Sequence, residues 1–478
     1  ERSVRYFLRV AGFAGLLATA GWGIQSVVAI PSVFPTGTTI YNPEKAWNGY
    51  TIIDTADREG AVLIDMNGNV LRRWEEMKGM GPFRMMPGGH VFGATAFRHP
   101  YQESVGLLQL SWEGERIWYF DRYEQVQAYE EDEDGEFVPT ETIWAARHHH
   151  DWQREGNPVG YYAPGQEPLL RGGRTMILAH KNVTVPEISD KRLEDDYIYE
   201  LNWEGEILWD WLASDHVDEL GFSEDARNAI YRSVQFNEDR QSADWLHINS
   251  ATYLGPNPWY DAGDERFHPD HIMISSRTAN IIAIIARDGS IAWRLGPDYT
   301  VTPEQAELGQ IIGQHNPHLI PQGLPGAGNL LVFDNGGTGG YGFANPARPD
   351  GTNSMTRDSS RVLEINPITL EIVWEYSFGG TERFQFYSAY VSNAQRLPNG
   401  NTLVNEGMHG RVFELTPEEE IVWEYVSPFF SDDDVPSHRV YRAHRLPYDW
   451  IPQLDAPEEI AVVPPALGNF RVPNQAQL

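Results

Sequence analysis

Residues 199–209, YELNWEGEILW, hold the pattern that decides the fold. Apolar and polar residues alternate up to a turn at Gly205, and a second apolar run then ends in Trp209. Alternation on both sides of a glycine turn is typical of a β-hairpin. The segment therefore predicts two adjacent antiparallel strands.

The same unit occurs six times along the chain. The other copies are LIDMNGNVLRRW (63–74), LQLSWEGERIW (108–118), IIARDGSIAW (284–293), LEINPITLEIVW (363–374) and FELTPEEEIVW (413–423). In five copies Trp follows the turn position by four residues, even where Leu370 or Glu419 stands in place of glycine. A fixed spacing of this kind indicates a repeat architecture.

A second hairpin signature, such as RLPNGNTLV at 396–404, precedes most copies and brings each unit to four strands. Six such units in series predict an all-β, six-bladed β-propeller. The first unit has strands at 50–54, 61–65 and 70–74 but none before them, so we expect 439–446 to complete it and close the ring. A pair of β-sandwich sheets built from unrelated hairpins is the alternative, and the repetition argues against it.

The amino-terminal segment predicts a membrane anchor. Arg2, Arg5 and Arg9 precede an apolar stretch at 10–34, which is long enough for one transmembrane helix. A signal peptide cleaved after residues 18–20 is the competing interpretation. Because basic flanks stay cytoplasmic, the propeller is expected in the periplasm or outside the cell. The predicted organisation is an anchor (1–36), a propeller (37–451) and a Pro-rich carboxy-terminal tail (452–478).

Composition excludes several classes of function. A content of 41% hydrophobic and 12% aromatic residues excludes a disordered chain. The formal net charge of −32 has the wrong sign for binding nucleic acid non-specifically. The chain has no Cys, so disulfides, thiolate catalysis and cysteine-ligated metals are excluded.

Histidines gather where the innermost strands of the predicted blades begin: His150 in a run of three, His247 in DWLHINS, and His315 and His318 in GQHNPH. Innermost strands line the channel of a propeller, so these imidazoles are expected to converge at one mouth. Such a cluster could ligate a divalent metal, with Asp151, Asp244 and Asp270 as orienting carboxylates. Alternatively, one imidazole acts as a nucleophile toward a sulfuryl or phosphoryl group, and neighbouring His and Arg residues neutralise its oxygens.

Several motifs in order carry a resemblance: DWLHINS (244–250), DHIMISSRTANIIAI (270–284), GQHNPH (313–318) followed by FDNG (333–336), then SRVLEI (360–365) and WEY (374–376). Over most of the chain after residue 48, the sequence resembles the bacterial arylsulfate sulfotransferase family. The resemblance implies a periplasmic six-bladed propeller that moves a sulfuryl group from an aryl sulfate to a phenolic acceptor, without a nucleotide sulfate donor. It implies a ping-pong mechanism through a sulfurylated channel histidine, and neither a metal nor a cofactor.

Matched by motif, His247 and His315 correspond to active-site histidines of the family, with Arg361 or Arg277 as the arginine. The segment that carries the nucleophile in the family, 384–395 here, has no His. His409 in EGMHGRVFEL and His150 are the two substitutes that the sequence offers. The candidate substrate-binding residues are Asn249, His318, Asp334, Asn335 and Tyr387.

Two other functions compete with sulfuryl transfer. An inactive propeller could serve as a binding or assembly subunit of a membrane complex, held in the bilayer through 10–34, and the missing nucleophile favours this. A metal-dependent hydrolase or lyase could use the histidine ring, and metal analysis would separate it from a sulfotransferase.

Overall fold

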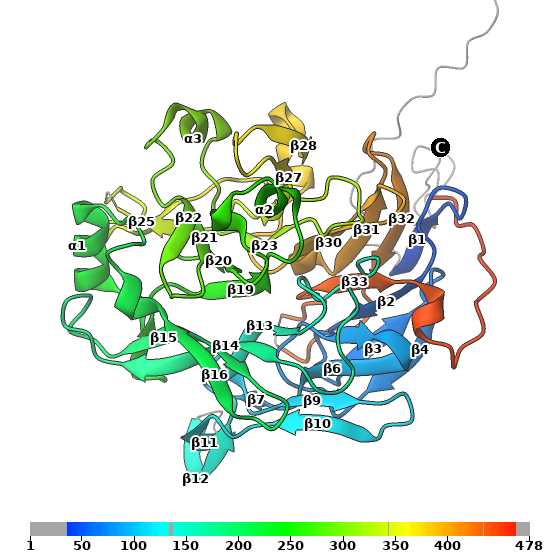
Figure 1. The fold of residues 1–478 in the computed structure, drawn as a ribbon, viewed down its shortest axis with the longest axis horizontal. Coiled ribbons are helices and arrows are strands. Elements are labelled where there is room, and N and C mark those ends of the chain that lie inside the picture. The colour runs from blue at the N-terminus through cyan, green and yellow to red at the C-terminus, as the bar shows by residue number, and fades with distance from the viewer. Residues whose placement is uncertain (1–35, 133–136, 343, 434, 465–478) are drawn as a thin grey trace, which may run out of the picture.

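The computed structural model describes residues 36–132, 137–342, 344–433 and 435–464. Their regular structure is almost entirely antiparallel β-sheet, arranged around a common centre (Figure 1). In the described part of the chain, six sheets each contain an antiparallel run of at least four strands. The prediction of an all-β, propeller-like fold is confirmed.

The sheets follow one another along the chain, and we number them in that order. The first is β33 (Ala443–Leu446), β2 (Tyr50–Ile53), β3 (Ala61–Ile64) and β4 (Val70–Trp74). The second is β5 (Arg84–Met86), β6 (His90–Ala94), β9 (Leu107–Leu110) and β10 (Arg116–Phe120). The third is β13 (His148–Arg154), β14 (Thr175–Val183), β15 (Leu193–Leu201) and β16 (Ile207–Leu212).

The remaining three sheets have the same arrangement. The fourth is β19 (Ile248–Tyr253), β20 (Ile272–Ser276), β21 (Ile281–Ile285) and β22 (Ile291–Leu295). The fifth is β23 (His315–Leu319), β24 (Leu330–Asp334), β27 (Arg361–Ile365) and β28 (Ile372–Tyr376). The sixth is β29 (Asn393–Arg396), β30 (Thr402–Glu406), β31 (Arg411–Leu415) and β32 (Ile421–Val426), with β1 (Gly37–Tyr41) added at its outer edge.

Shorter elements extend the third sheet or fill the connections. The strands are β7 (Phe97–Arg98), β8 (Glu103–Ser104), β11 (Glu124–Glu131), β12 (Phe137–Ala145), β17 (Phe236–Asn237), β18 (Ser242–Asp244), β25 (Gly339–Tyr341) and β26 (Thr352–Met355). The α-helices are α1 (Glu224–Ser233), α2 (Pro258–Asp261) and α3 (Pro303–Leu308). The 3₁₀ turns are η1 (Pro87–Gly89), η2 (Ala213–His216), η3 (Glu265–Phe267), η4 (Gly380–Gln385), η5 (Gly407–His409) and η6 (Tyr448–Trp450).

The carboxy-terminal strand closes the ring as predicted. β33 pairs antiparallel with β2, with Ala443 opposite Ile53 and Leu446 opposite Tyr50. The first sheet is therefore made from the two ends of the described chain, which lie side by side in Figure 1. β33 is far in sequence from β2, β3 and β4, so β33 cannot separate from these three strands without opening the ring.

Six hydrophobic clusters fill the spaces between sheets that are neighbours along the described chain. Representative members, in order from the first interface to the sixth, are Leu63 and Met85, Phe92 and Ile177, Leu178 and Ile274, Ile284 and Leu330, Phe333 and Phe413, and Val412 and Val62. The sixth cluster joins the last sheet back to the first. Each sheet thus packs on both faces, which explains why its central strands are almost entirely buried.

Four of the six repeated Trp residues link one sheet to the next through a hydrogen bond. The indole N–H of Trp118 donates to the Trp203 carbonyl at 3.0 Å, and that of Trp423 donates to the Met66 carbonyl at 2.7 Å. Trp209 and Trp374 donate in the same way to Arg287 and Pro417. Every acceptor lies two residues before the turn position of the following sheet. The fixed spacing in the sequence therefore encodes a contact between sheets.

No helix among the described residues is long and apolar enough to cross a bilayer. The predicted anchor at 10–34 lies outside the described residues. In the predicted tail, residues 452–464 run along the surface, and Val462 forms a bridge with Tyr41.

Candidate active site

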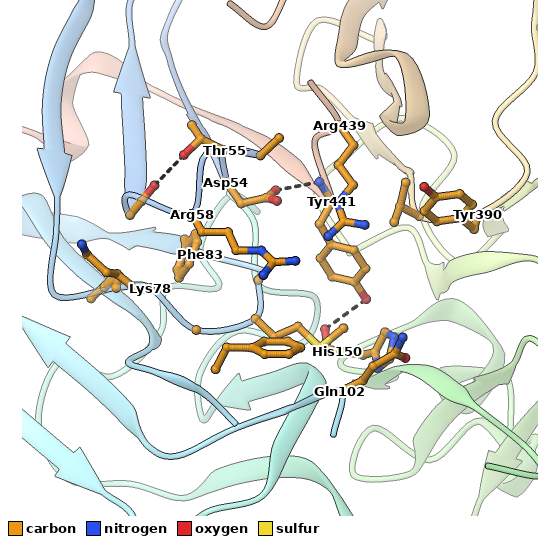
Figure 2. A pocket seen from close by; sticks show the side chains of 18 of the residues that line it. Asp54, Thr55, Arg58, Lys78, Phe83, Gln102, His150, Tyr390, Arg439 and Tyr441 are labelled. Atoms are coloured by element: carbon orange, nitrogen blue, oxygen red, sulfur yellow. Dashed lines mark hydrogen bonds between the residues drawn. The ribbon is translucent and has the colours of Figure 1, made fainter. Parts of the chain in front are cut away.

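A cavity of about 320 Å³ lies at the mouth of the channel, where the six inner strands begin. Each inner strand contributes a residue at or near its start: Phe83, His150, His247, His315, Tyr390 and Tyr441. Figure 2 shows Tyr441 between Asp54 and His150, with Arg58 and Arg439 reaching into the same space. The expected convergence of histidines therefore holds for His150, His247 and His315.

The backbone at these strand starts is unusual. His150 and His247 have positive φ values of 55° and 49°, and Asn316, next to His315, has 51°. The pairing register of β13, β19 and β23 shifts close to these residues. Bulges and left-handed residues bend a strand and re-aim its side chains, and they are concentrated at functional sites. Here the positive φ values and the register shifts occur at the residues whose three imidazoles point into one cavity.

His247 is held by a carboxylate. Its Nδ1 lies 2.5 Å from Oδ2 of Asp244, which ends the short strand β18. Burial alone would raise the pKa of the Asp244 carboxyl, but the charge and hydrogen bond of His247 hold it below its usual range. The hydrogen bond to Asp244 keeps a proton on Nδ1 of His247, so Nε2 is the ring nitrogen that is available to react. A carboxylate–imidazole pair of this kind is typical of a nucleophile or general base.

His150 and His315 are neutral, and the ring of each one forms hydrogen bonds with neighbouring residues. Nδ1 of His150 lies 2.8 Å from Nδ1 of His149, and its ring meets that of His247 edge to face at 4.7 Å. His315 bonds through Nδ1 to Oδ1 of Asn335 at 2.8 Å, while its Nε2 accepts the N–H of Val391 at 3.2 Å. Burial holds the pKa of both imidazoles well below the usual range, and nearby positive groups add to this.

Cationic side chains surround the imidazoles. Arg58, Lys78, Arg277 and Arg439 line the cavity, and Lys78 pairs with Glu59 at 2.8 Å. Among the described residues, the other three form no ion pair with a carboxylate, whereas Arg84, Arg361 and Arg442 are each paired. Nε of Arg277 is buried without any hydrogen-bond partner. Since this protein carries a net charge of −32, three unpaired arginines around one cavity indicate a site for an anion.

The other residues proposed from the sequence do not line the cavity. Arg361 begins the third strand of its sheet and pairs with Asp334 at 2.8 Å, which uses both side chains. His318 bonds to the Tyr161 hydroxyl at 2.9 Å, and the side chain of Asn249 donates to the Gln314 carbonyl at 2.7 Å.

Three further candidates have other positions. Asn335 lies outside the cavity lining and contacts Nδ1 of His315 through its Oδ1. Tyr387 is half-buried outside the cavity lining. His409 is exposed on η5, in the connection between β30 and β31. That connection joins the second and third strands of the sheet, which lie away from the channel, so the His409 side chain does not reach the cavity.

Sequence reasoning missed several lining residues, and the polar or charged ones include Asp54, Arg58, Lys78, Arg439 and Tyr441. Arg439 and Tyr441 begin the segment predicted to close the ring. The histidines were located because they lie where inner strands begin. The same criterion, extended to every inner strand and every polar residue type, would have found Arg439 and Tyr441. The loops that carry Asp54, Arg58 and Lys78 have no comparable signal.

The fold and the cavity define a propeller-like protein whose channel mouth is lined by imidazoles and unpaired arginines. The family model for arylsulfotransferase (ASST) matches residues 168–427, more than half of the chain, and the chain belongs to this family. The match includes His247, Arg277, His315 and Tyr390 and supports sulfuryl transfer at the level of the family. No curated protein sequence matches the chain.

Solved structures similar to this one are distant in sequence. A protein of unknown function from Bacteroides caccae is 11% identical, with 84% of this chain and 99% of that chain covered and a TM-score of 0.40. A streptogramin B lyase is 12% identical, with 88% and 96% covered and a TM-score of 0.34. AztD from Citrobacter koseri is 8% identical, with 84% and 99% covered and a TM-score of 0.31. At such TM-scores these structures carry no weight for the function.

Proposed function

We propose that this protein transfers a sulfuryl group from an aryl sulfate to a phenolic acceptor through a sulfurylated histidine, and that His247 is the nucleophile. The observation that carries the proposal is the combination of three unpaired arginines with a carboxylate-held imidazole in one cavity. An aryl sulfate offers an anionic head for Arg58, Arg277 and Arg439 and a ring for aromatic neighbours such as Phe83 and Tyr390.

The first half-reaction forms one bond and breaks one. Nε2 of His247 attacks the sulfur, the bond from sulfur to the aryl oxygen breaks, and the phenolate leaves with its electron pair. Ionised Asp244 stabilises the positive imidazolium that results. The arginines bind the sulfuryl oxygens and stabilise the negative charge that is carried by the transferring group and the leaving oxygen.

The second half-reaction regenerates the enzyme. The oxygen of a phenolic acceptor attacks the sulfur, the bond from sulfur to Nε2 breaks, and the electron pair returns to His247. Asp54 is the lining carboxyl placed to accept the proton of the acceptor. Burial raises its pKa to about 6, which suits a proton acceptor near neutral pH.

The test is to incubate the full chain with a chromogenic aryl sulfate, with and without a phenol, and to weigh the donor-only sample by intact mass spectrometry. We expect acceptor-dependent release of the chromogenic phenol and a sulfuryl adduct that maps to His247. His247→Ala should lose both, while Arg277→Met should lose at least about 100-fold in kcat/KM. His409→Ala, outside the cavity, is the matched control and should keep full activity.

Other outcomes reassign the function. An adduct on His150 would transfer the nucleophilic role to that residue. If no donor gives release or adduct, the protein is an inactive propeller acting as a binding or assembly subunit. The sequence of 384–395, which has no His, supports that second candidate.

We further propose that the six sheets are the six blades of one closed propeller, anchored in a membrane through 10–34 and facing the periplasm or the outside of the cell. Arg2, Arg5 and Arg9 before an apolar stretch support the anchor. Fractionation of a lysate without detergent should leave the full-length chain with the membranes. Recovery of the full-length chain in the soluble fraction would contradict the anchor.

A further inference from the structure

Behind the cavity, three adjacent strands of the third sheet place two imidazoles and a carboxylate together. His149 lies on β13, His180 on β14 and Asp196 on β15, where His180 and Asp196 are directly opposite each other in the pairing. All three are at least 99% buried, and one ligand atom from each lies within 4.8 Å of the others. None of them lines the active-site cavity.

Two of these atoms have no hydrogen-bond partner. Nε2 of His149 and Oδ1 of Asp196 are both buried and unpartnered, and they face each other at 3.4 Å. Buried polar atoms are rarely left unpaired, because each one costs about 1–3 kcal/mol. A proton shared between the two atoms does not explain the geometry, since such a hydrogen bond is about 2.5–3.2 Å long. By contrast, two ligands about 2.0–2.1 Å from a tetrahedral ion lie about 3.3 Å apart.

The charges around Asp196 also favour the binding of a cation. Among the described residues, no Lys or Arg pairs with Asp196, whose Oδ2 accepts only the N–H of Ile248 at 3.0 Å. Burial, followed by the charge of the nearby Asp244, raises the pKa of Asp196, and the charge of Asp244 also acts on His149. A second nearby carboxylate therefore adds to the negative potential at this point.

The contacts of His180 are those of a metal ligand. Its Nδ1 lies 3.2 Å from Oε2 of Glu103, which in turn is held by Arg98 and Arg147. Histidines that bind metals almost always donate their other ring N–H to a carboxylate or carbonyl, which fixes the tautomer. Glu103 has that role here, together with Glu194, whose Oε1 lies 3.3 Å from the same Nδ1, and we therefore assign Nε2 of His180 to the ion.

We propose that His149, His180 and Asp196 form a buried site for a divalent metal ion that prefers imidazole and carboxylate ligands, with Zn²⁺ as the best fit. Binding requires the two imidazole rings, stacked at 3.7 Å, to splay around the ion. The ion would lie outside the cavity and would not touch a substrate.

The site has a consequence for the active site, and this consequence rests on the proposed function. An ion on Nε2 of His149 leaves the proton of that ring on Nδ1, which then donates to Nδ1 of His150 at 2.8 Å. His150 must then carry its own proton on Nε2. The metal would thus make His150 a hydrogen-bond donor that can bind a sulfuryl oxygen beside His247.

The test measures metal directly, independently of turnover. The full chain is loaded with Zn²⁺, freed of excess by dialysis and analysed by inductively coupled plasma mass spectrometry. We expect about one Zn²⁺ per chain, and at least about tenfold weaker binding for Asp196→Asn, which keeps the acceptor for Ile248. Asp195→Asn is the matched control, because Asp195 bonds to Trp245 and Ser214 instead and should leave metal binding unchanged.

A second readout covers variants that fold poorly. Chelation of the wild-type protein should lower its unfolding temperature, and addition of Zn²⁺ should restore it. Substoichiometric Zn²⁺ in the loaded wild-type protein, or equal Zn²⁺ in Asp196→Asn, would overturn the site. Loss of sulfuryl transfer with Zn²⁺ still bound would count against the proposed function alone.

Discussion

Single residues at the cavity have environments that set their charge. Asp54 is the clearest case, because burial raises its pKa from 3.8 to about 6 even though it accepts N–H groups of Tyr441 and Arg442. Between these two values the folded protein keeps a proton that the unfolded chain has released. The stability that neutral Asp54 contributes is therefore complete below about pH 4 and is lost as the pH rises through 6.

We expect Asp54→Asn to raise the free energy of unfolding at pH 7 by about 1–3 kcal/mol, because the amide oxygen keeps both N–H contacts without the buried charge. At pH 4 the variant and the wild type should be nearly equal. Urea titrations at the two pH values measure the difference. A gain of the same size at both pH values would mean that the effect comes from packing rather than from ionisation.

The histidines show how far single residues can be assigned from the sequence. His150, His247 and His315 could be placed because they start inner strands, and all inner strands meet at one axis. The choice between Arg277 and Arg361 could not be made from the sequence, since both lie next to strands of neighbouring sheets. It depends on which arginine finds a carboxylate, and Asp334 lies beside Arg361.

At the level of the strand and turn, the repeat imposes a backbone conformation. The turn positions Gly68, Gly114, Gly205 and Gly289 have φ between 81° and 92°, and Leu370 and Glu419 take the same left-handed conformation at 60° and 67°. A side chain in this region costs about 1–2 kcal/mol. We expect Glu419→Gly, at an exposed site, to stabilise the protein by about 0.5–1 kcal/mol, as measured by urea denaturation.

Glu418 is the control for this turn. It is exposed and adjacent but does not have a positive φ, so Glu418→Gly should destabilise the protein slightly. Equal effects at both positions would show that the gain at 419 does not come from backbone conformation.

The Trp contacts between sheets differ in burial, which allows a matched comparison. Trp423 is fully buried and bonds to Met66 at 2.7 Å, whereas Trp374 is half-buried and bonds to Pro417 at 3.2 Å. Trp423→Phe leaves a cavity and removes one of the two hydrogen bonds to the Met66 carbonyl, which keeps only the one from the Thr38 hydroxyl, so we expect a loss of about 2–4 kcal/mol. Trp374→Phe should lose about 1 kcal/mol or less, because water replaces its partner. Equal losses in urea denaturation would contradict a role for burial.

At the scale of the whole molecule, stability depends on ring closure. β33 supplies the inner strand of the first sheet, and Leu446, Trp450 and Ile451 pack into the cluster between the first two sheets. We expect a chain ending at residue 437 to lose its cooperative thermal transition and to aggregate, because β2 becomes an open edge. A chain ending at 464 keeps β33 and should melt like the full chain. A cooperative transition in the shorter chain would show that the remaining sheets are stable without closure.

The sequence by itself determined the all-β propeller-like fold, the repeated hairpin and the closing segment at 439–446, of which residues 443–446 form the strand β33. These features follow from local alternation, turn residues and a constant spacing to Trp, which a chain carries wherever it folds. Only the tertiary structure decided that Arg277 lines the cavity while Arg361 does not, that Asp244 holds His247, and that His149, His180 and Asp196 meet on three strands. Those relations join residues from different strands and loops, and they depend on register, bulges and ring closure, which local patterns do not encode.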